Sequence, residues 1–139
     1  MANETGKPFT QSDAEISEAI DFLEYYPLTF GDLNHQLDAT LLPRGTGLVI
    51  GPWNFPLAIP CGGIVQSLIT GNTTLLKPAP EAFHIAQALM ACFRDAGICE
   101  DVLDLALCQE GPDLDALVQS KHINFILFTG STTTAKTIL

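Results

Sequence analysis

Three short stretches of the sequence place polar residues directly after an apolar run. Asn54 follows residues 48–50 within PWNFP, Lys77 ends TTLLK, and Gly-Ser-Thr at 130–132 follows FILF. An amide held by flanking rings and prolines can donate to a developing oxyanion. A lysine can bind a sugar phosphate, and the free N–H groups at a helix start suit a pyrophosphate. The residue types therefore predict a binding site, provided the fold brings the three stretches together.

Each stretch also has a plainer structural interpretation. Asparagine is favoured as the N-cap of a helix, so Asn54 can simply cap a helix that begins at Pro56 or Leu57. A lysine at the end of a strand is often solvated, and Gly-Ser-Thr also caps helices that bind nothing. The sequence has no G-x-G-x-x-G fingerprint. Position alone leaves both interpretations open for all three stretches.

Composition limits the partners of the chain. Its 139 residues carry 6 Lys+Arg against 16 Asp+Glu, a net charge of −10, with 47% hydrophobic residues. This balance is typical of a packed globular protein and repels phosphate backbones and anionic membranes. MANETGKPFT lacks the basic and apolar regions of a signal peptide, and we expect no transmembrane helix. The sequence predicts a cytoplasmic protein with neither a nucleic-acid nor a membrane partner.

The cysteines and histidines do not form a metal motif. The sequence has no CxxC pair and no histidine at ligand spacing from a cysteine. We therefore expect no metal site and interpret the cysteines as reduced thiols of a cytoplasmic protein. These cysteines are Cys61, Cys92, Cys99 and Cys108.

The elements that must position the three stretches follow from periodicity. A capping box from Ser12 to Glu15 and apolar residues at helical spacing predict a helix to about Tyr26, where Pro27 ends it. We expect residues 28–45 to be a loop. Beyond them, strands alternate with helices. The predicted strands are 47–51, 73–77, 102–107 and 124–128, and the predicted helices are 57–70, 82–97, 113–120 and one that starts near Gly130.

This alternation predicts an α/β fold, with a parallel sheet and helices on both faces. Ligands of such sheets gather at the carboxyl ends of the strands. Lys77 ends a predicted strand, and Asn54 and Gly130 each follow one, so we expect the three residues at one edge of the sheet.

Taken together, the motifs resemble the aldehyde dehydrogenase superfamily in type, order and spacing. The residues are PWNFPL at 52–57, GNT at 71–73 leading to KPA at 77–79, and FTGST at 128–132. More loosely, ETGKP at 4–8 and the helix at 14–26 resemble the family's helix before this region. That helix, LLPRGTG at 41–47, PWNFPLAI at 52–59 and the Ala135 that ends GSTTTA most resemble the glutamate-semialdehyde (Δ1-pyrroline-5-carboxylate) dehydrogenases, including those of bifunctional proline-utilisation proteins. The resemblance implies that residues 1–40 are an N-terminal helix and connecting loop. Residues 41–139 would form a truncated, partial Rossmann-like dinucleotide-binding domain.

The resemblance also implies a reaction. Such enzymes oxidise an aldehyde, here glutamate semialdehyde, to the acid with NAD or NADP, and we favour NAD. A cysteine thiolate forms a thiohemiacetal, whose oxyanion the Asn54 amide would hold, and a glutamate activates the hydrolytic water. In the family both the cysteine and the glutamate lie beyond the position of Leu139. We therefore expect this chain alone to be inactive and the full-length enzyme to be a homo-oligomer.

Roles for further residues follow from the same motif matches. Lys77 would hydrogen-bond the adenine-side ribose. The other implied cofactor-binding residues are Ile50, Pro52 and Trp53 lining the cleft, and Gly130 and Ser131 at the helix that faces the pyrophosphate.

Two departures from the family pattern support an alternative. Pro80 stands where the family usually has an acidic ribose ligand, and Glu81 follows one place late, so Glu81 is a doubtful cofactor-binding residue. The family's glycine-rich turn falls on Cys108, Gln109 and Glu110, which lack glycine's access to positive φ. These changes favour a non-catalytic dinucleotide-binding or interaction module derived from the same fold.

Overall fold

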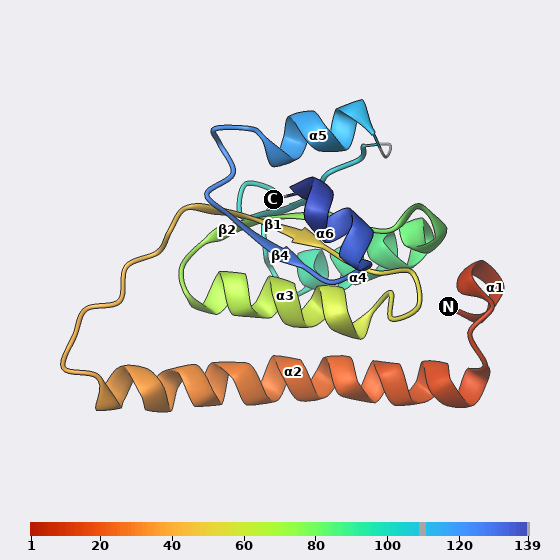
Figure 1. The fold of residues 1–139 in the computed structure, drawn as a ribbon. Coiled ribbons are helices and arrows are strands. Elements are labelled where there is room, and N and C mark those ends of the chain that lie inside the picture. The colour runs from red at the N-terminus through yellow and green to blue at the C-terminus, as the bar shows by residue number, and fades with distance from the viewer. Residues whose placement is uncertain (109–110, 139) are drawn as a thin grey trace.

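Short strands rich in leucine, isoleucine and phenylalanine form a parallel sheet in the computed structural model, which describes residues 1–108 and 111–138 (Figure 1). The strands are β1 (Thr46–Ile50), β2 (Thr73–Lys77), β3 (Leu103–Leu105) and β4 (Phe125–Phe128). The 4-stranded sheet has the order β3-β2-β1-β4, and each of its strand pairs is parallel. The predicted α/β class and parallel sheet are confirmed.

Helices cover both faces of this sheet (Figure 1). On one face lie α3 (Ala58–Ile69) and α4 (Phe83–Asp95), the latter preceded by a 3₁₀ turn, η1 (Pro80–Ala82). On the other face lie α5 (Pro112–Val118) and α6 (Thr132–Ile138). The crossovers that join parallel strands require this arrangement.

A long helix, α2 (Phe9–Gln36), follows a short α1 (Ala2–Thr5) and runs along the outer side of α3 (Figure 1). The prediction that Pro27 ends this helix is wrong, because Pro27 lies inside α2. Proline costs the helix one hydrogen bond, but packing against α3 outweighs that local penalty. The two helices approach so closely that a Cβ at Gly62 would lie 3.0 Å from the Phe22 ring.

The predicted capping box is also wrong. The N-cap of α2 is Pro8, and Ser12 lies inside the helix with its hydroxyl donating to the Lys7 carbonyl at 3.4 Å. Glu15 is 2% exposed and points toward α3, where its carboxylate accepts hydrogen bonds from the N–H groups of Leu57 and Ala58. Glu15 therefore hydrogen-bonds to the start of α3, which is distant in sequence, and not to the start of its own helix.

The main core lies between the sheet and the pair α3 and α4. Side chains from β1, β2 and β3 pack there against both helices; the buried members include Val49, Ile64, Leu76, Leu89, Phe93 and Leu103. A Cβ at Gly63 would lie 2.9 Å from a Val49 methyl carbon, so glycine permits the close approach of α3 to β1.

Across residues 1–108 and 111–138, no helix has the length and apolar character needed to cross a bilayer. The same residues hold no group of three or more His, Cys, Asp or Glu side chains placed to bind a metal ion.

Candidate functional site

The register of the sheet brings the three sequence stretches to one edge. Ile50, the last residue of β1, stands opposite both Lys77 on β2 and Phe128 on β4. The Gly51 N–H donates to the Lys77 carbonyl at 3.2 Å, and the Thr129 N–H donates to the Ile50 carbonyl at 3.1 Å. The turns that follow these three strands therefore leave the sheet side by side.

A cavity of about 490 Å³ opens where these turns meet. This volume is within the range of small-molecule sites. Every residue predicted to bind cofactor or oxyanion lines it: Ile50, Pro52, Trp53, Asn54, Lys77, Glu81, Gly130 and Ser131. The predicted clustering of the three stretches is thus observed. Leu114 of α5 and Thr134 of α6 also line the cavity, and no motif in the sequence pointed to either of them.

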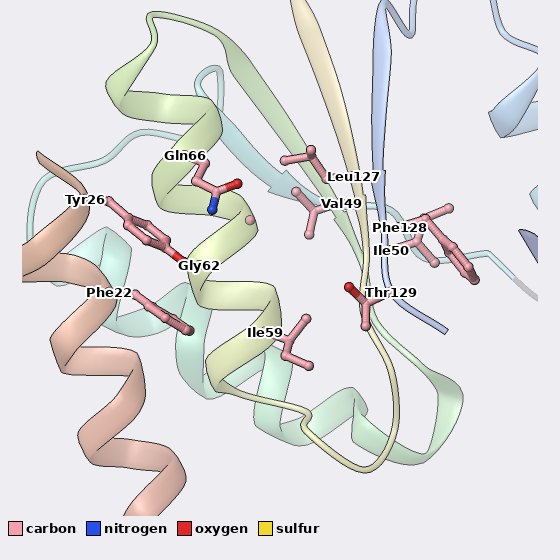
Figure 2. Close-up of a pocket in the computed structure, with 11 residues that line it drawn as sticks. Phe22, Tyr26, Val49, Ile50, Ile59, Gly62, Gln66, Leu127, Phe128 and Thr129 are labelled. Atoms are coloured by element: carbon pink, nitrogen blue, oxygen red, sulfur yellow. The ribbon is translucent and has the colours of Figure 1, made fainter. Parts of the chain in front are cut away.

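A second cavity of about 250 Å³ lies between α2, α3 and the strands β1 and β4. Figure 2 shows Phe22 and Tyr26 of α2 turned toward α3 on one side, with Val49 and Leu127 of the sheet on the other. Gln66 of α3 contributes an amide to an otherwise largely apolar lining. This cavity adjoins the candidate site, because Ile50, Ile59, Phe128 and Thr129 line both cavities. Asn54, Lys77, Gly130 and Ser131 do not line it.

Asn54 does not cap α3. The N-cap residue of this helix is Leu57, and within the described residues the helix receives no bond from a capping side chain of its own. The Glu15 carboxylate instead accepts from the N–H groups of Leu57 at 2.7 Å and Ala58 at 3.1 Å. The helix-cap interpretation of Asn54 is therefore wrong, and its exposed side chain lines the cavity.

Lys77 is buried at the cavity, with 3% of its surface exposed. The solvated interpretation of this lysine is therefore wrong. Burying an ammonium group carries a desolvation cost, and Lys77 has a further interaction within the protein. A cation held at the wall of a cavity can bind the hydroxyl or phosphate oxygens of a ligand.

The third stretch begins α6. The Ser131 hydroxyl oxygen accepts from the Thr134 N–H at 3.1 Å, as an N-cap residue does. Gly130 lies so close to the Phe128 ring that a Cβ would meet its Cζ atom at 2.5 Å. Gly130 and Ser131 also line the cavity wall. Capping of α6 by Ser131 is therefore compatible with ligand binding in the cavity.

The four cysteines, each among the described residues, do not line the candidate cavity. Cys61 is buried in α3, and its burial, together with the negative charge of Cys92, raises its pKa from 9.0 to about 11. Burial raises the pKa of Cys108, Lys77 lowers it, and Asp113 raises it, with a net upward shift. In the part of the chain that the structure describes, no cysteine lines the cavity beside Asn54. Gln109 and Glu110, predicted to replace a glycine-rich turn, lie outside the described residues.

An open parallel sheet with a cavity beyond the carboxyl ends of its strands is the arrangement of α/β domains that bind ligands at this edge. The chain belongs to the aldehyde dehydrogenase family, whose profile matches residues 1–139.

Individual relatives agree with this assignment. A 1-pyrroline-5-carboxylate dehydrogenase of Geobacillus sp. (strain WCH70) is 39% identical, over 94% of this chain and 27% of the relative. Proline Utilization A from Corynebacterium freiburgense superposes with a TM-score of 0.94 at 38% identity, covering 99% of this chain and 14% of that one. A Thermus 1-pyrroline-5-carboxylate dehydrogenase with bound NAD gives a TM-score of 0.83 at 33% identity, covering 97% and 28%. This chain therefore spans about a quarter of its curated relatives' length.

Proposed function

We propose that this chain forms the cofactor cleft and the oxyanion-binding turn of an NAD(P)-dependent aldehyde dehydrogenase. The observation that carries the proposal is the single cavity at the carboxyl edge of the sheet, which gathers Asn54, Lys77, Gly130 and the other predicted residues. Residues 41–139 are then part of a dinucleotide-binding domain, preceded by the N-terminal helix and loop of residues 1–40.

Glutamate semialdehyde is the substrate that the relatives favour. The curated relatives that match along 94% of this chain carry the name 1-pyrroline-5-carboxylate dehydrogenase, and solved neighbours include proline-utilisation proteins. The nucleophilic cysteine and the general-base glutamate lie outside this chain in the proposal. Two observations support that assignment: no cysteine is among the described residues lining the cavity, and Cys61 is a protonated thiol at neutral pH.

The residues present fit a nicotinamide dinucleotide. A buried cation, Lys77, and the backbone at Gly130 and Ser131 line one cavity, as a polyanionic ligand with sugar hydroxyls requires. When bound, the cofactor supplies the hydride acceptor. The protein orients it: Lys77 binds the ribose, and Ile50, Pro52 and Trp53 contribute the wall of the cleft. The Asn54 amide donates to the oxyanion of the reacting aldehyde.

NAD is favoured over NADP by the charge at Glu81. This exposed carboxylate lines the cavity, and a negative charge there repels an additional phosphate on the ribose. The protein's cytoplasmic location and the full-length enzyme's homo-oligomeric state, without nucleic-acid or membrane partners, stay predictions.

A non-catalytic dinucleotide-binding or interaction module is the second candidate. It is favoured by Pro80 at the position of the usual acidic ligand, and by the absence of a cysteine among the described residues of the cavity wall. Only the interaction module would fail to bind the cofactor. Cofactor binding therefore distinguishes it from the dehydrogenase and from the non-catalytic dinucleotide-binding module.

Calorimetric titration with NAD and NADP tests the proposal. We expect saturable binding that is tighter for NAD, and a roughly tenfold loss of affinity in Lys77→Met, because one charge-assisted hydrogen bond is worth about 1.5 kcal/mol. Lys121→Met, which removes an exposed lysine remote from the cavity, is the matched control. An absence of binding by a chain with a native circular dichroism spectrum would leave the interaction module.

A further inference from the structure

A buried ion pair lies against the turn that carries Asn54. Lys7, which precedes α2, places its Nζ atom 2.5 Å from the Oε2 atom of Glu15 in α2. Their side chains are 7% and 0% exposed. Neither residue belongs to the sheet, and neither lines the candidate cavity. Their location nevertheless links the N-terminal segment to the turn between β1 and α3.

The Lys7 side chain binds the turn at Asn54 itself. Its Nζ atom donates to the Asn54 carbonyl oxygen at 2.9 Å. The same ammonium group lies 3.7 Å from the centroid of the Phe55 ring, close enough for a cation–π interaction. The Lys7 ammonium group thus binds both the backbone of Asn54 and the ring of Phe55.

Glu15 binds the other end of the turn. Its Oε1 atom accepts from the N–H groups of Leu57 and Ala58, while its Oε2 atom faces Lys7. The two carboxylate oxygens therefore join the cation beside Asn54 to the first N–H groups of α3. The ion pair therefore fixes the backbone from the Asn54 carbonyl to the N–H groups of Leu57 and Ala58, and Asn54 stands at one end of this segment.

Stability alone does not account for this arrangement. Burying two charges costs a desolvation penalty that their attraction often fails to exceed, and an apolar pair of similar size commonly serves folding equally well. The cap of α3 could also have come from Asn54, whose residue type is suited to that role. Because Glu15 supplies the cap, the Asn54 amide is not engaged at the helix end.

We propose that Lys7 and Glu15 are positioning residues, which hold the Asn54 amide in the geometry required to receive an oxyanion. The inference rests on the proposed role of Asn54 in the aldehyde dehydrogenase reaction. Oxyanion donors act only when they are preorganised, and a displacement of about 1 Å can cost on the order of a hundredfold in rate. Neither Lys7 nor Glu15 lines the candidate cavity, so loss of the ion pair should disorder the turn and weaken cofactor binding less than loss of Lys77 does.

The order of the turn can be measured in this chain directly. Trp53 is its only tryptophan, adjoins Asn54 and is 56% exposed, so fluorescence anisotropy and acrylamide quenching report on this turn alone. The side-chain amide signals of Asn54, assigned by their loss in Asn54→Ala, report by NMR on the group that would bind the oxyanion.

Lys7→Met and Glu15→Gln are the test variants, with Lys121→Met and Glu18→Gln as controls at exposed positions. In folded test variants we expect at least twofold more quenching of Trp53, lower anisotropy and a shifted, sharper Asn54 amide signal, with a loss of NAD affinity smaller than the roughly tenfold loss expected for Lys77→Met. Lys7→Arg, which keeps the cation, should restore the original signals. If Lys7→Met does not fold, the same Trp53 and Asn54 measurements on Glu15→Gln provide the test.

Unchanged Trp53 and Asn54 signals in variants that only unfold more readily would overturn the inference, because the pair would then serve stability alone. A loss of NAD affinity as large as that of Lys77→Met in folded variants would also contradict it. Failure of the proposed function has a different signature: the unsubstituted chain would not bind NAD, while the Trp53 and Asn54 signals would still respond to the ion pair.

Discussion

Glu15 and Leu57 are 42 residues apart in sequence, yet the Glu15 Oε1 atom lies 2.7 Å from the Leu57 backbone nitrogen. A similar relationship joins Glu4 to α4, where the Glu4 carboxylate accepts from the N–H groups of His84 at 2.7 Å and Ile85 at 3.0 Å. The N-terminal segment therefore supplies carboxylates to the starts of both helices on one face of the sheet. Negative charge at a helix N-terminus is stabilising, so this segment is part of the framework of the candidate site.

The cap that Glu4 provides should depend on pH. Burial raises the pKa of Glu4, but hydrogen bonds from the His84 N–H, the His84 ring and the Ile85 N–H, with the charge of His84, bring it below 4.5. The stabilisation is therefore complete above about pH 4.5, and it is lost as the pH falls through the lowered pKa. Glu4→Gln should reduce the free energy of unfolding by about 1 kcal/mol at pH 7.

Urea denaturation at a series of pH values measures this difference, with the exposed Glu24→Gln as control. The curves of Glu4→Gln and the original chain should converge as the pH falls through the lowered pKa of Glu4. A difference that does not shrink as the chain is acidified would show that the carboxylate charge plays no part in the cap.

Close packing of α3 on the sheet makes a matched pair of glycine substitutions informative. A Cβ at Gly63 would lie 2.9 Å from the Val49 Cγ1 atom, and Val49 is a stiff, buried residue of β1. Gly63→Ala should therefore lower the free energy of unfolding by about 1–3 kcal/mol. Gly31→Ala, in open space on α2, should raise it by about 0.5–1 kcal/mol. Equal effects at the two positions, measured by thermal or urea unfolding, would contradict the observed contact of α3 with β1.

Thiol chemistry distinguishes the buried cysteine from the exposed ones. With a pKa of about 11, Cys61 is about one-thousandth thiolate at pH 8, and the thiolate is the reactive species. Iodoacetamide should therefore label the exposed Cys92 and Cys99 in the native chain well before Cys61, as peptide mass spectrometry would show. Preferential labelling of Cys61 would contradict its burial.

The same chain should not oxidise glutamate semialdehyde. Absorbance at the NADH band should stay flat when aldehyde and NAD are added together, because the proposed nucleophile and general base lie outside these residues. Aldehyde-dependent NADH formation that disappears in Cys61→Ser, Cys92→Ser, Cys99→Ser or Cys108→Ser would place the nucleophile inside the chain.

Sequence reasoning succeeded where the signals are local. Pro52, Pro78 and Gly130 mark strand ends, and short strand segments alternating with helical ones predicted each strand of the sheet and the convergence of its polar ends. It failed at Pro27 and at the Ser12–Glu15 box, where local rules gave the wrong answer. Glu15 takes its hydrogen-bond partners from the start of α3, and Phe22 packs beside Gly62 of α3. Such contacts between residues about 40 positions apart leave no local pattern.

The most direct test of the central claim is an ¹⁵N NMR titration of this chain with NAD. We predict saturable shifts of the Trp53 indole N–H and the backbone amides of Gly130 and Ser131, which line one cavity at the carboxyl edge of the sheet. The side-chain amide of Asn72, which lines a different cavity, should not move. Shifts confined to Asn72 and its neighbours, or no saturable shift at any residue of the folded chain, would contradict the assignment of the cofactor site.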